Sequence, residues 1–173
     1  MKLITALIAL ALVGYGAVLF IGESKEFGVT EAGLEWMPLE QGVAAAKQKN
    51  KTIVVDVYTD WCGWCKKMDK EVYTHEGVVK ILNKEFVAIK LNAESSNKVT
   101  FNGSTMSQSE LARSLGVTGY PTTVFFTSDA RLITTLPGYV AGEEFSHILT
   151  FIGEEHFEKM SYEEFRKRPD TQN

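Results

Sequence analysis

The chain contains only two cysteines, and both lie in the stretch Asp-Trp-Cys-Gly-Trp-Cys-Lys-Lys, residues 60–67. Cys62 and Cys65 are two residues apart, so they could close a small disulfide, ligate a metal ion or exchange electrons with another disulfide. The apolar, β-branched run 51–60 predicts a strand, and a helical pattern begins at about Gly63. Free backbone N–H groups at a helix start stabilise an anion, which predicts a low-pKa thiolate at Cys62.

Three kinds of chemistry compete at this cysteine pair. A structural zinc site needs about four ligands, and the chain offers no second cysteine pair and only three histidines. A purely structural disulfide across so short a loop would constrain little of the unfolded chain. Electron transfer is favoured, with an exposed Cys62 attacking a disulfide and a shielded Cys65 resolving the mixed disulfide. A carrier that holds copper or zinc through the same two thiolates remains the alternative.

Composition indicates the kind of domain that carries these cysteines and the partners that it excludes. The chain has 173 residues, of which 45% are hydrophobic and 23% charged, which predicts one globular domain with a single core. The net charge of −4 gives no broad basic surface, so a nucleic-acid partner is excluded. For the electron-transfer interpretation we expect neither a cofactor nor a bound metal.

The N-terminal segment, residues 1–22, is predicted to be a membrane anchor or a signal segment. Its run 3–21 is uncharged and, at about 1.5 Å per residue, close to the roughly 30 Å of bilayer hydrocarbon. A positive start at Lys2 before an apolar run also fits a cleaved signal peptide. The small-residue triplet 9–11 lies inside the run rather than after it, which favours an uncleaved anchor. Lys2 then favours a cytoplasmic N-terminus, with the rest of the chain on the periplasmic side.

Beyond this segment, residues 23–35 mix glycine and charge and are predicted to be a linker. Residues 36–173 are predicted to form the folded domain. The polar, glycine-containing stretch 93–107 is expected to be a loop. The expected strands are 51–60, 86–92, 122–128 and 131–138, and the expected helices are 39–50, one from Gly63 with a kink near 73–77, one from Ser107, and 142–157.

Two capping boxes mark further helix starts. Ser107 stands three residues before Glu110, and Ser161 three residues before Glu164, so each pair can satisfy two free backbone N–H groups. The second box predicts a short final helix as a C-terminal extension of the domain. The alternation of helices and strands predicts an α/β domain with the cysteines at a strand-to-helix junction.

The chain resembles a thioredoxin-fold protein in motifs that occur in matching order. The stretch Thr-Ile-Val-Val-Asp-Val-Tyr-Thr-Asp-Trp-Cys-Gly-Trp-Cys-Lys resembles the thioredoxin segment in which a strand with a buried aspartate leads into the redox-active pair. This resemblance implies a central mixed β-sheet flanked by helices. It also places Asp56 on the buried acid, Trp61 on the flanking tryptophan and Cys62 on the nucleophile.

Later segments extend the resemblance. Val-Ala-Ile-Lys-Leu-Asn resembles the next strand, with Lys90 on the lysine that lies near the acid. Leu-Gly-Val-Thr-Gly-Tyr-Pro-Thr-Thr-Val-Phe-Phe resembles the segment whose cis-proline faces the disulfide, which places Pro121 there with Tyr120 before it. Gly138 falls where the family has a glycine beside the active site.

Roles follow for these residues. An acid in an apolar strand is costly unless it is paired or neutral, so we expect Asp56 to transfer a proton near Cys65, with Lys90 tuning it. Rigid aromatic groups in an active-site loop favour a substrate-facing surface. The expected substrate-contacting residues are Trp61, Trp64, Tyr120 and Pro121.

The departures from the family pattern narrow the type of protein. Trp64 replaces the proline of the family's commonest reducing motif, and the stretch 93–107 is longer than in the shortest thioredoxins. With the N-terminal segment, these features resemble extracytoplasmic thioredoxin-like proteins and the C-terminal domains of thiol:disulfide interchange proteins. The sequence therefore predicts a thiol–disulfide oxidoreductase that reduces disulfides of extracytoplasmic proteins, with a membrane disulfide reductase as electron donor. Disulfide oxidation or isomerisation remains an alternative direction.

Overall fold

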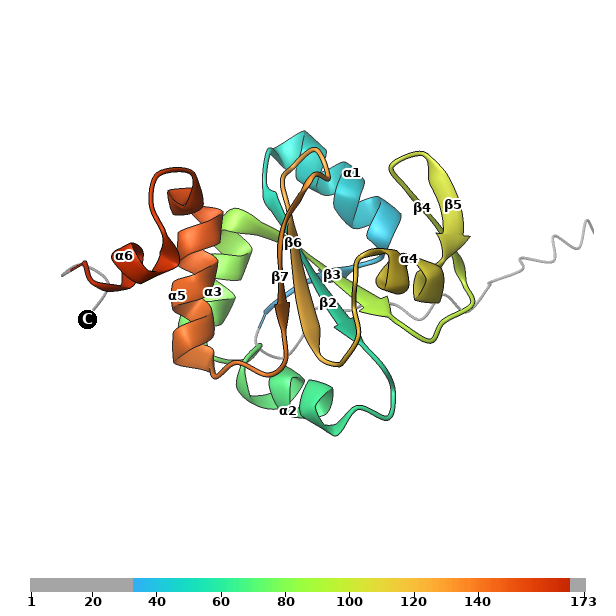
Figure 1. The fold of residues 1–173 in the computed structure, drawn as a ribbon, viewed down its shortest axis with the longest axis horizontal. Coiled ribbons are helices and arrows are strands. Elements are labelled where there is room, and N and C mark those ends of the chain that lie inside the picture. The colour runs from blue at the N-terminus through green and yellow to red at the C-terminus, as the bar shows by residue number, and fades with distance from the viewer. Residues whose placement is uncertain (1–32, 169–173) are drawn as a thin grey trace, which may run out of the picture.

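The computed structural model describes residues 33–168 and is built around a five-stranded sheet (Figure 1). A separate two-stranded hairpin lies beside α4. In chain order the elements are β1 (Trp36–Met37), α1 (Leu39–Lys49), β2 (Thr52–Tyr58), α2 (Gly63–Glu71), α3 (Glu76–Glu85), β3 (Phe86–Asn92), β4 (Lys98–Phe101), β5 (Ser104–Ser107), α4 (Gln108–Ser114), β6 (Thr122–Phe126), β7 (Leu132–Pro137), α5 (Gly142–Gly153), the 3₁₀ turn η1 (His156–Glu158) and α6 (Tyr162–Arg166).

The strand order β1-β3-β2-β6-β7 makes β2 the central strand of the sheet. β2 runs parallel to β3 and antiparallel to β6, so the expected mixed sheet is confirmed. This register sets Asp56 beside Lys90 on one neighbouring strand and beside Thr123 on the other. The sheet itself therefore places the acid between Lys90, which pairs with it, and Thr123.

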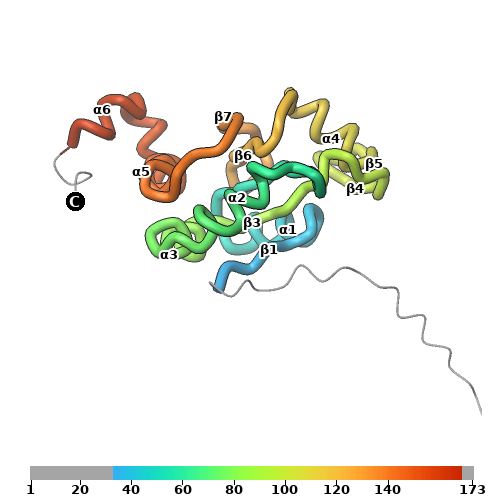
Figure 2. The backbone as a smooth tube through the Cα atoms, turned by 90° about the horizontal axis from the view of Figure 1, so that it is seen from below, coloured from blue at the N-terminus to red at the C-terminus, as the bar shows by residue number. Residues whose placement is uncertain are grey.

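Helices cover both faces of the sheet (Figures 1 and 2). α1, α4 and the β4–β5 hairpin pack on one face, while α2, α3 and α5 pack on the other. Within β2, Ile53, Val55 and Val57 belong to the first core cluster and Val54 to the second. Because side chains alternate along a strand, Asp56 lies on the face of Val54, toward α2 and α3.

Two of the expected elements have different forms in the structure. The helix predicted from Gly63 with a kink near 73–77 is two separate helices, since α2 ends at Glu71 and α3 begins at Glu76. The helix expected over 142–157 ends at Gly153 and is followed by η1. The short strand β1 was not expected from the sequence.

The expectation of a loop over 93–107 is wrong, because β4 and β5 form an antiparallel hairpin there. Its turn is Asn102-Gly103, and both residues have positive φ, at 49° and 79°. A two-residue Asn-Gly turn matches the right-handed twist of the flanking strands and is the strongest short-range hairpin signal. The sequence thus carried the signal, within a stretch whose polarity is typical of a loop.

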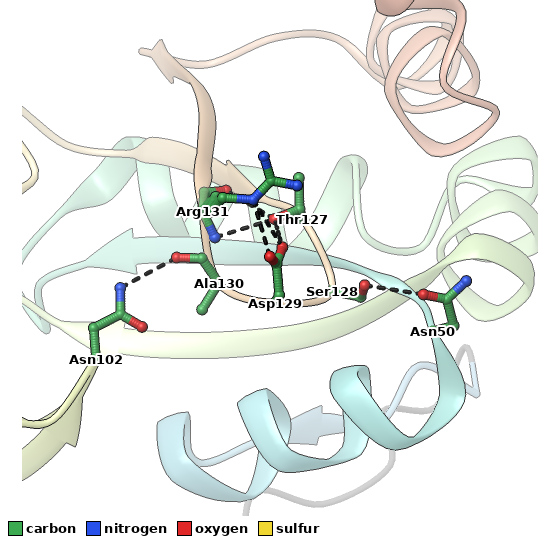
Figure 3. A network of polar contacts seen from close by, with 7 residues as sticks. All are labelled: Asn50, Asn102, Thr127, Ser128, Asp129, Ala130 and Arg131. Atoms are coloured by element: carbon green, nitrogen blue, oxygen red, sulfur yellow. Dashed lines mark hydrogen bonds and ion pairs between the residues drawn. The ribbon is translucent and has the colours of Figure 1, made fainter.

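Polar contacts tie this hairpin to the turn between β6 and β7 (Figure 3). The Asn102 side-chain amide donates to the Ala130 carbonyl at 3.2 Å, and the Arg131 Nε donates to the Asp129 carboxylate at 2.9 Å. This turn follows the end of β6 that pairs with Ile53, at the start of β2. The network therefore braces the end of the sheet opposite the cysteines.

Both predicted capping boxes are confirmed, at the starts of α4 and α6. The predicted membrane segment, the run 3–21, lies outside the part of the chain that the structure describes. Among residues 33–168, none of the helices has the length and apolar character needed to cross a bilayer. The domain boundaries proposed from the sequence stay predictions.

The close approach of α1 to β3 yields a first prediction. A Cβ on Gly42 would lie 2.5 Å from Cγ1 of the buried Ile89. Gly42→Ala should therefore lower the free energy of unfolding by about 1 kcal/mol, because overpacking of about 1–3 kcal/mol outweighs the gain of about 1 kcal/mol in helix propensity. Urea unfolding measures this, and Ala44→Gly on the exposed side of α1 gives the propensity effect alone. A stabilised Gly42→Ala variant would contradict this packing.

Candidate active site

Cys62 and Cys65 are joined by a disulfide with their Cα atoms 5.3 Å apart. Cys62 is the N-cap of α2, as its place in the sequence predicted, and its Sγ accepts a hydrogen bond from the Cys65 N–H at 3.0 Å. The same N–H and the positive end of the helix dipole would favour a Cys62 thiolate after reduction. The position of Cys62 thus fits a nucleophilic thiol.

The expected exposure of Cys62 is wrong for this disulfide-bonded form. Only 4% of Cys62 and 2% of Cys65 are exposed. The reason is local, since the Cys62 sulfur is turned toward the helix backbone and bonded to Cys65. By contrast, the flanking Trp61 and Trp64 are 66% and 57% exposed. The disulfide is recessed between two prominent indole rings.

Each tryptophan pairs with a tyrosine from a distant segment. Trp61 makes an edge-to-face contact with Tyr120, with ring centroids 6.0 Å apart. Trp64 packs against Tyr139 at 5.4 Å. The two pairs form a surface around the disulfide that we call the aromatic rim. Rings held in this way offer large contact area with little loss of conformational entropy.

Ionic contacts hold the Trp64 side of the aromatic rim. The Lys67 ammonium lies 5.0 Å from the Trp64 ring centroid and 5.2 Å from that of Tyr139. The Tyr139 hydroxyl donates to the Glu71 carboxylate at 3.0 Å, and Lys67 lies 3.9 Å from the same carboxylate. One face of α2 therefore fixes Tyr139 beside Trp64.

Pro121 and Gly138 lie together near the rim. The bond between Tyr120 and Pro121 is cis, as the resemblance implied. The Gly138 N–H donates to the Pro121 carbonyl at 2.8 Å. Gly138 has φ +88°, a backbone conformation that residues with a Cβ rarely adopt. This explains why a glycine is found at this position.

Asp56 lies in a buried charge cluster that reaches α2, the helix that carries the disulfide. Its Oδ2 accepts a hydrogen bond from the Lys90 ammonium at 2.6 Å, and its side chain is 2% exposed. Lys90 also pairs with Asp69 of α2, whose side chain is 48% exposed. Asp69 stands one helical turn after Cys65, so a chain of charges leads from the solvent through Lys90 to the buried acid.

Aromatic rings surround the Lys90 ammonium. It lies 4.7 Å from the Trp36 ring centroid and 5.2 Å from those of Tyr58 and Tyr73. Such rings attract a desolvated cation through their negative faces. Trp36 on β1 and Tyr73 after α2 thus help to keep the charge of Lys90 within the core.

This environment shifts the pKa of both members of the ion pair. Burial raises the pKa of Asp56 above its ordinary value, although the charge of Lys90 works to lower it. Burial also works to lower the pKa of Lys90, but the charges of Asp56 and Asp69 outweigh it and raise that pKa. Asp56 is therefore a carboxyl that holds a proton more tightly than an exposed acid.

The structure brings the sequence-predicted residues into two groups. The first group consists of the disulfide and the residues connected to it: Cys62, Cys65, Trp61, Trp64, Tyr120, Pro121 and Gly138. Asp56 and Lys90 form the buried pair. Sequence reasoning missed Asp69 and Tyr139, although Asp69 stands four residues after Cys65 on a predicted helix and could have been placed on its face.

Within residues 33–168, no group of three or more histidine, cysteine, aspartate or glutamate side chains could hold a metal ion. Exchange of electrons between thiols and disulfides is the chemistry that the cysteine pair fits. That chemistry defines a class, the thiol–disulfide oxidoreductases. A family model described as a thioredoxin-like domain matches residues 39–153, and the chain belongs to that family.

Individual relatives agree with this family. An uncharacterised protein of Caenorhabditis elegans is 35% identical over 102 residues, which cover 58% of this chain and 13% of the relative. The thiol:disulfide interchange protein DsbD of Pseudoalteromonas atlantica is 30% identical over 96 residues, covering 55% of this chain and 14% of that protein. The chain thus matches only a small part of the length of these relatives.

A solved structure gives the same fold. The solution structure of a thioredoxin from Thermus thermophilus superposes with a TM-score of 0.57 at 27% identity, covering 69% of this chain and 86% of that one.

The raised pKa of Asp56 predicts how stability depends on pH. The unfolded acid has a pKa near 3.8, so between that value and the higher folded value the folded state binds more protons. The contribution of Asp56 to the free energy of unfolding should therefore fall as pH rises through this window. The side chain of Asp56→Asn cannot ionise. As pH rises through the window, the free energy of unfolding of this variant should therefore increase relative to that of the wild type, by about 1.4 kcal/mol per unit of pKa shift. Urea unfolding of the oxidised proteins from pH 3 to pH 8 measures the difference.

Glu110→Gln is the control with the opposite sign. Hydrogen bonds from Ser107 lower the pKa of Glu110 to about 2, so its contribution is present above pH 4.5 and is lost as pH falls. The free energy of unfolding of Glu110→Gln should therefore decrease relative to that of the wild type as pH rises. Parallel curves for Asp56→Asn and wild type would contradict the raised pKa.

Proposed function

We propose that the protein is a thiol–disulfide oxidoreductase that reduces disulfides of extracytoplasmic proteins. The observation that carries this proposal is the Cys62–Cys65 disulfide at the N-terminus of α2, the helix that Asp69 and Lys90 connect to a buried acid. A family model over most of the domain and similarity to part of a DsbD protein support it.

The reaction moves two electrons from the enzyme to the substrate. In the reduced enzyme the Cys62 thiolate attacks one sulfur of a substrate disulfide, and the other substrate sulfur leaves as a thiolate. A mixed disulfide then joins Cys62 to the substrate. Cys65, once deprotonated, attacks the Cys62 sulfur, closes the disulfide seen here and releases the second substrate thiolate. Solvent protons complete the dithiol product, and an external dithiol must then reduce the enzyme.

Asp56 is the base that prepares Cys65 for this second attack. Cys65 is only 2% exposed in the disulfide form, so its sulfur has almost no contact with bulk water and needs a base within the protein. A carboxylate with a raised pKa accepts a proton near neutral pH better than an exposed one. Lys90 holds this carboxylate at 2.6 Å and connects it to Asp69 on the solvent side of α2.

The aromatic rim is the surface that receives the substrate. Trp61 and Trp64 are more than half exposed, and each directly precedes one of the two buried cysteines in the sequence. A polypeptide seated between these rings brings its disulfide to Cys62, with Tyr120, Pro121 and Gly138 at its other edge. The large exposed apolar area favours a protein substrate over a small polar thiol.

The location and the electron donor extend the proposal. The N-terminal run 3–21 anchors the domain on the periplasmic side of the membrane, or directs its export if it is cleaved. That compartment is oxidising, so a membrane disulfide reductase is the fitting source of electrons. The reduction potential of the Cys62–Cys65 pair decides between reduction, oxidation and isomerisation as the direction in the cell.

Separate variants of the two cysteines test this function. Cys65→Ser should attack disulfides and then stall, accumulating a mixed disulfide that a reductant removes. Cys62→Ser should trap nothing and lose at least about 1,000-fold in insulin reduction, since the nucleophile is absent. Non-reducing gels and mass spectrometry of the adducts measure this.

Two outcomes would count against the assigned roles. Trapping by Cys62→Ser but not by Cys65→Ser would reverse the nucleophile and the resolving thiol. If neither variant traps a partner and both lose bound copper or zinc that the wild type holds, the protein is a metal carrier.

Fractionation tests the placement. If the run 3–21 is an anchor, the protein should stay in the membrane fraction after a carbonate wash, because about 30 Å of apolar helix does not leave the bilayer. A reporter fused after Asn173 should be active only outside the cytoplasm. A version that starts at residue 33 is the control and should be soluble. Release of a shortened full-length product would show a cleaved signal instead.

A further inference from the structure

Unpaired polar atoms gather around Asp56 on the side away from Lys90. Among the residues that the structure describes, four buried side-chain atoms have no hydrogen-bond partner. Three of them are Oδ1 of Asp56, the hydroxyl of Tyr73 and Oγ1 of Thr123. All three residues are at most 1% exposed. Neither hydroxyl has been given a role in the chemistry proposed above.

These three groups come from different elements and face one another. Thr123 on β6 is the register partner of Asp56 on β2. The Asp56 carboxyl and the Thr123 hydroxyl are both near enough to the Tyr73 hydroxyl to act on its pKa. The acid thus has Lys90 at Oδ2 and two hydroxyl groups on its other side.

The ring of Tyr73 is fixed in this direction. Trp36 meets it edge-to-face with centroids 4.8 Å apart, and Phe145 of α5 meets it at 6.0 Å. A hydroxyl that cannot turn to water has to find its partner inside the core. Phenylalanine and valine would fill the sites of Tyr73 and Thr123 without burying an oxygen, so the two hydroxyls point to a role toward the acid.

We propose that Tyr73, supported by Thr123, is a positioning residue for Asp56, donating its O–H to Oδ1 while Lys90 holds Oδ2. Thr123 donates in turn to the Tyr73 oxygen, so both protons point toward the carboxylate. This arrangement orients the carboxylate and stabilises its ionised form. It rests on the proposed function, in which ionised Asp56 takes the proton of Cys65.

The surrounding charges agree with this direction of donation. Burial raises the pKa of Tyr73 well above its ordinary value, so its hydroxyl keeps its proton near neutral pH. Lys90 on β3, Asp69 on α2 and Tyr58 at the end of β2 are the other titratable groups around the acid. Lys90 favours the ionised acid and Asp69 opposes it, so a neutral donor at Oδ1 adds to the effect of Lys90.

Tyr73→Phe tests the proposal through a pH profile. The mixed disulfide on Cys62 is formed with a fluorescent peptide, and its release by Cys65 is followed in single turnover from pH 5 to pH 9. Removing the donor should move the midpoint of this profile to higher pH by about one unit. Thr123→Val should move it in the same direction by less. Carbon-13 NMR titration of the Asp56 carboxyl in the full chain should show the same two shifts.

Tyr162→Phe is the matched control, because it removes a tyrosine hydroxyl that bonds to Glu144. This bond joins α6 to α5, and α6 lies apart from β2, the strand of Asp56 (Figure 1). Its profile should superimpose on that of the wild type. If Tyr73→Phe also superimposes in both measurements, the inference is wrong, and a shift to lower pH would overturn it equally. If Tyr73→Phe does not fold, Thr123→Val decides in the same way.

Asp56→Asn separates this inference from the proposed function. If that variant keeps the wild-type release profile, Asp56 is not the base and the proposed mechanism fails. The NMR titration of Asp56 in Tyr73→Phe still decides whether Tyr73 donates to it. If Asp56→Asn abolishes the pH dependence of release while Tyr73→Phe keeps the wild-type midpoint, the mechanism stands and Tyr73 has no part in it.

Discussion

The ion pair between Asp56 and Lys90 is the constraint around which the site is arranged. A carboxylate at the centre of a buried sheet carries a desolvation cost of several kcal/mol, and only close pairing offsets it. The parallel register of β2 and β3 makes the two residues neighbours, and their charged atoms meet at 2.6 Å. Because a buried charge left without a partner costs about 3–5 kcal/mol, Lys90 would depend on Asp69 alone if Asp56 were lost. The short strand β1 contributes to the same interaction, since it brings Trp36 over the Lys90 ammonium.

α2 joins this charged interior to the redox surface. Its first turn carries the disulfide, and its next turn carries Asp69, which pairs with Lys90. The solvent side of the same helix carries Lys67 and Glu71, which hold Tyr139 against Trp64. A movement of α2 on opening the disulfide would therefore be felt both at the buried acid and at the aromatic rim.

Much of this arrangement could be predicted from the sequence, and the remainder depends on contacts across the chain. The place of Cys62 at a helix start, the pairing of Asp56 with Lys90 and the two capping boxes follow from local patterns and from the resemblance. The Asn102-Gly103 hairpin was missed although its signal was present. The ring contacts of Tyr73 with Phe145 and of Tyr139 with Trp64 could not be read from one sequence, because they join residues 72 and 75 positions apart and depend on how helices cross the sheet.

The two cysteines are chemically alike, and their surroundings make them different. Cys62 ends the extended segment after β2, beneath the exposed indole rings, where a substrate can approach from the outside. Cys65 lies inside the first helical turn, on the side of α2 that faces the charge cluster through Asp69. In the proposed mechanism, electrons enter or leave at the aromatic rim, while the proton of Cys65 is taken up in the interior, where the acid, its lysine and the solvent-exposed carboxylate lie in sequence. Separating the two paths in this way would keep water from Cys65 and still supply a base for its thiol, which a disulfide placed on an open surface could not do.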